Sequence, residues 1–120
     1  MEICNFEIAK KLKEKGFNEL CYKYYQKGVL DSDDCWNRYN KGTADRCSAP
    51  TISQVLKWLF DEKQLFVNID CNICDKFGLF FTIYKKGEET WEACGFDDNY
   101  YNKPEEATLA AIEYVLDNLI

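Results

Sequence analysis

Apolar residues recur at helical spacing in three segments of the chain, and each segment carries signals for the start or end of a helix. The first predicted helix begins after Asn5, a residue type that caps helices, and runs to about Lys15. Gly16 then supplies the left-handed residue of a Schellman motif, which brings Phe17 back toward Leu12. One face carries Ile8, Ala9 and Leu12, and the other carries most of the lysines Lys10, Lys11, Lys13 and Lys15.

The second helical segment follows Pro50, where Thr51 and Gln54 have the spacing of a capping box. Its apolar residues form one continuous stripe, made of Ile52, Val55, Leu56, Leu59 and Phe60. Trp58 lies on the opposite flank of this helix. The stripe predicts which side of this helix packs into the core.

The last helix begins near Pro104, with Glu105 and Glu106 at the positive end of its dipole. Two apolar stripes run along it, one of Leu109, Ile112, Leu116 and Leu119, the other of Ala107, Ala110, Ala111 and Tyr114. A helix that is apolar on two sides is either sandwiched or shared with a partner. Self-association through this helix is therefore one prediction.

Three strands are predicted between the second and last helices, at residues 65–71, 79–85 and 90–96, with Lys86-Gly87-Glu88 as the turn between the last two. Alternation places two sets of side chains on the face that should meet the helices: Leu65, Val67, Ile69 and Cys71, and Leu79, Phe81 and Ile83. Residues 20–25 predict a weaker strand, and residues 26–49 a long loop.

These segments predict an α+β fold in which helices flank a three-stranded antiparallel sheet, in the order α-β-β-β-α over residues 50–120. The N-terminal helix, weak strand and long loop of residues 1–49 are added to it. A length of 120 residues, of which 47% are hydrophobic, favours a single domain with its own core.

The distribution of charged residues along the chain favours some classes of binding partner over others. The net charge is -6, and residues 61–120 carry thirteen acidic against five basic residues, whereas residues 1–60 carry eight against ten. Such an acidic half repels a phosphate backbone, which favours a basic or protein partner over nucleic acid. The chain has neither an export signal at its start nor an apolar run long enough to cross a membrane, so we expect a cytoplasmic protein.

The seven cysteines are odd in number, and without an export signal we interpret them as reduced thiols. Cys71 and Cys74 have the spacing of half a zinc site. The other five cysteines are isolated in sequence, so buried thiols are the favoured interpretation and a metal site at Cys71 and Cys74 is the alternative. No cofactor is predicted.

Catalysis by a cysteine or serine usually needs a histidine base, and the chain has no histidine. Aromatic residues remain as interaction candidates: Trp58, and Phe96, Asp97, Asp98, Tyr100 and Tyr101 before the last helix. For Trp58 we favour burial in the core over exposure at an interface.

The helix and strand order of residues 51–119, together with Ala107, Ala110 and Ala111, resembles the double-stranded-RNA-binding domain. That family grips phosphates with lysines where this chain has Pro104, Glu105 and Thr108, so the resemblance implies a fold and not RNA binding.

A second resemblance rests on the lysine-rich helix ending in Gly16-Phe17, on Ser48-Ala49-Pro50-Thr51, on Lys57-Trp58-Leu59 and on Glu105-Glu106-Ala107. It resembles small uncharacterised proteins of Bacteroides-type bacteria, often associated with phage or mobile elements, and implies no catalytic activity.

The leading hypothesis is a non-enzymatic protein-interaction module of a bacterial mobile element, whose contact surface is the acidic C-terminal half with the aromatic segment from Phe96 to Tyr101. One alternative is a nucleic-acid-related protein, which either binds phosphates through the N-terminal lysines or mimics DNA. The other is a metal-binding protein centred on Cys71 and Cys74.

Overall fold

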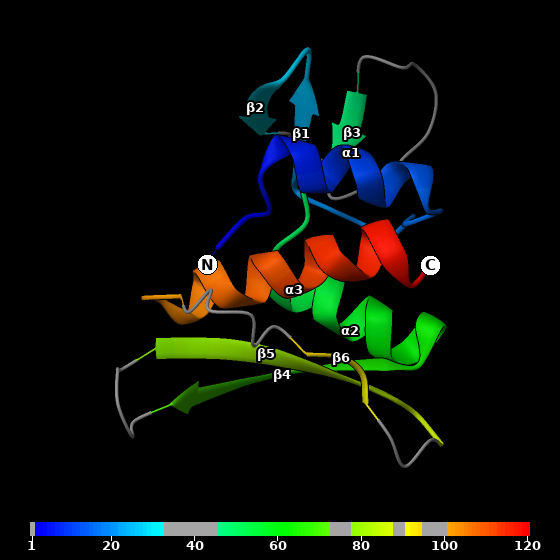
Figure 1. Ribbon diagram of the computed structural model, residues 1–120. Coiled ribbons are helices and arrows are strands. Elements are labelled where there is room, and N and C mark those ends of the chain that lie inside the picture. Colours follow the sequence, from blue (N-terminus) through cyan, green and yellow to red (C-terminus); the bar gives the residue numbers. More distant parts are fainter. Residues whose placement is uncertain (1, 33–45, 73–77, 88–90, 95–100) are drawn as a thin grey trace. The chain divides into compact units, whose positions relative to one another are not determined.

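In the described residues, two groups of antiparallel strands are separated and flanked by single helices, which confirms the predicted α+β class (Figure 1). The computed structural model describes residues 2–32, 46–72, 78–87, 91–94 and 101–120. Its elements are α1 (Phe6–Glu14), β1 (Lys23–Gln26), β2 (Val29–Ser32), β3 (Arg46–Ser48), α2 (Ile52–Lys63), β4 (Leu65–Asn72), β5 (Gly78–Lys85), β6 (Trp91–Cys94) and α3 (Pro104–Asn118). They divide into two compact units, Met1–Val55 and Leu56–Ile120.

In the first unit, both predicted ends of α1 are confirmed. The side-chain oxygen of Asn5 accepts a hydrogen bond from the backbone N–H of Ile8 at 2.9 Å. At the other end Gly16 adopts φ +90°, and the N–H of Phe17 donates to the carbonyl of Leu12 at 2.9 Å, which is the 6→1 hydrogen bond of a Schellman motif.

Where the sequence predicts a weak strand and a long loop, the structure has a three-stranded antiparallel sheet in the order β2-β1-β3, so that part of the loop prediction is wrong. Lys27 and Gly28 both have positive φ, 52° and 79°, and they connect the paired residues Gln26 and Val29. This is the backbone of a type I′ hairpin turn. The sequence does not predict this turn, because lysine occupies a position that Asn or Asp usually occupies in type I′ turns.

The core of the first unit lies between α1 and this sheet. Ala9 of α1 packs with Tyr25 of β1 and with Cys47 and Ala49, and Ile3 and Phe6 cover the edge of the cluster. The Tyr25 hydroxyl donates to the carbonyl of Cys4 at 2.7 Å, so the buried tyrosine is satisfied.

The capping box of α2 is confirmed. The N–H of Gln54 donates to the Thr51 hydroxyl at 3.1 Å, and the N–H of Thr51 donates to the Gln54 side chain at 2.9 Å. The predicted apolar stripe is correct only in part, since Val55 and Leu59 are fully buried whereas Phe60 is 44% exposed.

In the second unit, β4, β5 and β6 form the predicted antiparallel meander. The register pairs Val67 with Ile83 and Ile69 with Phe81, so the two apolar faces predicted from alternation are one face. Helix α3 and the C-terminal part of α2 lie on the same side of this sheet (Figure 1).

Helix α3 contacts β4 and β5. Its two predicted stripes merge, because Ala107 and Ala111 from one stripe are buried together with Ile112 and Leu116 from the other. Self-association through α3 stays a prediction. Within the described residues, no helix is long and apolar enough to cross a membrane.

Candidate functional site

An exposed apolar groove runs between α2 and β4 in the second unit. It has a volume of about 340 Å³, and its walls are formed by Leu56, Lys57, Phe60, Asp61, Phe66 and Val67. The groove owes its position to the connection between the two elements: Gln64 stands alone between them, and its φ of +59° turns the chain sharply. Residues from the last turns of the helix and the start of the strand are thereby brought together.

Two phenylalanines dominate this groove. Phe60 and Phe66 are 44% and 52% exposed, and their rings meet edge to face with centroids 6.3 Å apart and planes at 81°. Tyr84 lies directly opposite Phe66 in the β4–β5 ladder and is 37% exposed. Large aromatic side chains with this much exposure, gathered in one place, are typical of binding surfaces.

Charged groups border the aromatic pair. The ammonium group of Lys86 lies 5.7 Å from the centre of the Phe60 ring, a cation–π geometry. On the helix, Lys57 and Asp61 form an ion pair of 2.6 Å. The side chains of Lys57 and Asp61 are 79% and 46% exposed to water, so this pair contributes little to stability.

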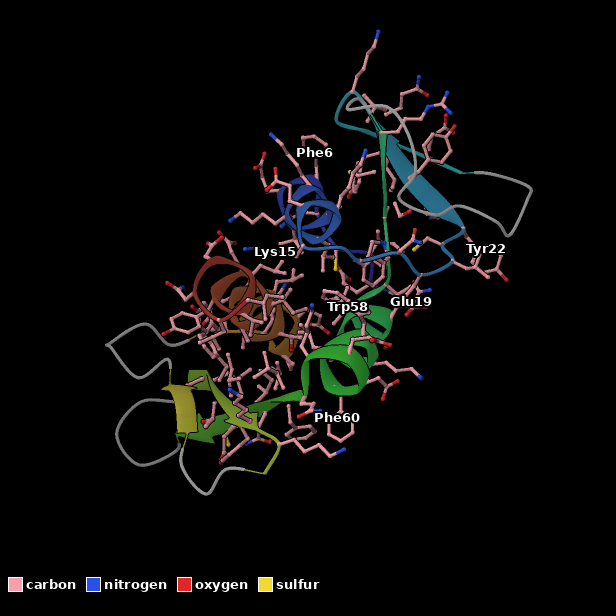
Figure 2. The ribbon with its side chains drawn as sticks, turned by 90° about the vertical axis from the view of Figure 1, so that its right-hand side faces the viewer. Phe6, Lys15, Glu19, Tyr22, Trp58 and Phe60 are labelled. Carbon is pink, nitrogen blue, oxygen red and sulfur yellow. The ribbon has the colours of Figure 1, made fainter. Side chains whose placement is uncertain are left out.

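Trp58, an interaction candidate from the sequence, is 6% exposed. It leaves α2 on the side opposite Phe60 (Figure 2), and the Lys63 ammonium group lies 5.4 Å from the centre of its ring. The favoured interpretation of Trp58 as a buried residue is confirmed. The exposed aromatic of this helix is instead Phe60.

The aromatic segment before α3 is described only at its end. Phe96, Asp97, Asp98 and Tyr100 lie outside the described residues. Tyr101 exchanges two backbone hydrogen bonds with Leu79, of 2.9 and 2.8 Å, and its ring lies 6.5 Å from that of Phe81. It is thereby fixed against β5, with part of its side chain buried.

Cys71 is an exposed free thiol, and Cys74 lies outside the described residues. Within the part of the chain that the structure describes, no three metal-ligating side chains converge. Whether Cys71 and Cys74 bind a metal stays a prediction.

Three other cysteines, Cys4, Cys21 and Cys47, are buried in the first unit. Burial raises the pKa of Cys4 to about 12, reinforced by Cys21 and Glu2 nearby. Burial also raises the pKa of Cys21 to about 11, against the lowering effect of a hydrogen bond to Ser48. These thiols stay protonated at neutral pH, which makes them poor nucleophiles and poor metal ligands.

The lysines of α1 were the candidate phosphate contacts. Lys13 donates to the carbonyl of Arg46 at 2.6 Å, so its ammonium group is engaged within the protein. Nucleic-acid binding through the lysines of α1 stays a prediction.

No family model, curated protein or solved structure matches the chain. Neither sequence resemblance is tested by these comparisons. The aromatic groove was missed because the sequence assigns Phe60 to a buried stripe. The available signal was Phe66, which alternation places on the face of β4 away from the helices.

Proposed function

We propose that this protein is a non-enzymatic protein-interaction module that binds its partner through the groove of Phe60 and Phe66. The proposal keeps the class of function that the charge pattern suggests and moves the contact surface from the segment before α3 to the connection between α2 and β4. We further propose a cytoplasmic, mobile-element setting, on the strength of the resemblance to Bacteroides-type proteins.

One observation carries the proposal: two phenylalanines stand about half exposed side by side at the edge of a groove. Leaving this much apolar area in water costs roughly 25 cal/mol for each Å², a cost that a bound partner removes. Aromatic residues clustered in a desolvated pocket are also the side chains that contribute most to protein–protein affinity.

Site-specific photo-cross-linking tests the proposal. A benzoylphenylalanine at position 66 is expected to give a discrete adduct with a partner in cells that encode the protein. The matched control carries the same group at Tyr22, which projects from the first unit and is 51% exposed (Figure 2). Phe60→Ser should abolish the adduct at position 66, because it removes the facing wall of the groove.

Two outcomes would contradict this function. One is the absence of any adduct from position 66. The other is an adduct of the same mass from positions 66 and 22, since that would indicate unspecific contact.

A further inference from the structure

Among the described residues, strand β4 lies at the edge of its sheet and carries little of the usual protection against further pairing. In the described residues it pairs only with β5, in the sheet order β4-β5-β6. It is 8 residues long, and its register with β5 runs without a shift from Leu65 to Asn72. It contains no proline, no lysine and no bulge, which are among the devices that natural proteins use to prevent an edge from accepting another strand, and its one charged side chain is Asp70 near its end.

The hydrogen-bond pattern shows which backbone groups face the open edge. The N–H of Lys86 donates to the carbonyl of Gln64 at 2.8 Å, which fixes the alternation of the antiparallel ladder. Phe66 and Asn68 therefore face β5, while the N–H and C=O groups of Val67 and Ile69 point outward.

The next outward N–H supports this assignment. That of Cys71 donates to the carboxylate of its neighbour Asp70 at 2.9 Å, as expected of a group with no strand beside it. Among the described residues, no hydrogen bond from a separate element reaches the outer side of Val67 or Ile69. Both residues are only partly buried, which agrees with an edge that no described element covers completely.

The apolar groove lies directly beside these open groups, since Val67 belongs to both. A strand added to β4 would place every second side chain over the groove of Phe60 and Phe66. Backbone hydrogen bonds and alternate apolar pockets together are the physical basis of peptide recognition by strand addition.

The charged groups beside the groove indicate which further residue type the added strand contains. The ammonium group of Lys86 lies over the ring of Phe60, which lines the groove, and no described carboxylate forms an ion pair with it. An acidic side chain on the added strand would form an ion pair with Lys86. Because the second unit as a whole is acidic, a single carboxylate on an otherwise uncharged segment fits better than an acidic run.

We propose that the open edge of β4 binds an extended segment of a partner protein by strand addition, with apolar residues at alternate positions and one acidic residue facing Lys86. This inference rests on the proposed function, because it specifies how the same groove is occupied.

The test uses the full chain and fluorescent peptides of 8 residues, the length of β4, in which Val alternates with Thr. One peptide has Glu at its first position and another at its last, since the strand can add in either direction. Saturable binding is expected by fluorescence anisotropy for one of them. Changing that Glu to Lys, or Lys86→Glu in the protein, should weaken binding about tenfold, and combining both changes should restore it.

Amide hydrogen exchange then measures whether the outward backbone amides of β4 become protected when the peptide binds. The amides of Phe66 and Asn68 should be protected in the free protein, and those of Val67 and Ile69 should become protected only with bound peptide. Val67→Pro removes an outward donor that the ladder to β5 does not use, so the fold should tolerate it and binding should be lost. Should this variant fail to fold, a peptide N-methylated on alternate residues provides the same test.

Three results would overturn strand addition. Binding without new protection of Val67 and Ile69 would show a different mode. Protection that rises with protein concentration in the absence of peptide would show that a second copy occupies the edge. Failure of both peptides to bind, while the cross-link from position 66 persists, would reject this inference and leave the proposed function standing.

Discussion

Phe60 of α2 and Phe66 of β4 meet edge to face across a connection of one residue, Gln64. Both rings keep about half of their surface in water. The pair therefore closes the corner between helix and strand on one side and offers an aromatic surface on the other. Its contribution to folding can be measured separately from its contribution to binding.

A double-mutant cycle with Phe60→Ala and Phe66→Ala should give a coupling of about 0.5–1.5 kcal/mol in the free energy of unfolding, the range for an aromatic pair. Urea denaturation provides the measurement. Phe66→Leu serves as the control, since it keeps an apolar side chain without a ring and should show less coupling to Phe60. Strictly additive effects would mean that the ring contact contributes nothing to folding.

Gln54 has two roles in the first unit, and two substitutions separate them. Its side-chain oxygen accepts from the Thr51 N–H at 2.9 Å, and its side-chain nitrogen donates to the Leu20 carbonyl at 2.8 Å. Gln54→Glu keeps the acceptor and loses the donor, so it should cost about 1 kcal/mol, whereas Gln54→Ala should cost about 2. Ser53→Ala, at the neighbouring exposed position, should leave the urea midpoint unchanged. Equal losses for Glu and Ala would show that the cap contributes nothing.

Lys27 is a non-glycine residue with φ 52° in the turn between β1 and β2. This conformation is unfavourable for lysine and better tolerated by asparagine. Lys27→Asn should therefore stabilise the protein by about 0.5–1 kcal/mol, measured as a higher urea midpoint. The same change at Lys23, which lies within β1, should give no gain. A lower midpoint for Lys27→Asn would contradict the turn assignment.

The buried thiols predict a loss of stability in alkali. The pKa of Cys4 is about 12 and that of Cys21 about 11 in the folded protein, against an ordinary value of 9.0. Unfolding exposes both thiols and lets them ionise at a lower pH, so their stabilising contribution is complete below pH 9.0 and is lost as the pH rises through about 11 for Cys21 and about 12 for Cys4. For Cys4 the limiting slope is about 1.4 kcal/mol per pH unit.

Urea denaturation at several pH values above and below 9.0 measures this loss. Cys4→Ala removes one titrating group and should flatten the curve. Identical pH profiles for the natural protein and Cys4→Ala would show that Cys4 is not protected from ionisation by folding.

Much of the local structure was predictable because it depends on residues close in sequence. The cap at Asn5, the Schellman motif at Gly16 and the capping box of Thr51 and Gln54 each involve side chains within a few positions of one another. The meander of β4, β5 and β6 was predictable because two-residue alternation and a glycine turn leave one simple way to pair consecutive strands. The hairpin at Lys27 and Gly28 was not predicted, because lysine is not typical of turn positions with positive φ.

The candidate site was less predictable than the fold. Periodicity shows which residues of a helix share a side, but it does not show where the covered side ends. Val55 and Leu59 are buried while Phe60, on the margin of the same stripe, is not. Trp58 shows the converse, because it lies off the stripe and is buried.

The sequence by itself determined the α+β class, the ends of the helices and the faces of the central strands, since short-range sterics and hydrogen bonding decide these. Only the tertiary structure decided that Phe60 and Phe66 are exposed to solvent side by side. It also decided that the outward backbone N–H and C=O groups of Val67 and Ile69 lie beside them. The exposure of a side chain depends on which helices and strands pack over it, and this packing joins segments that are far apart in the sequence.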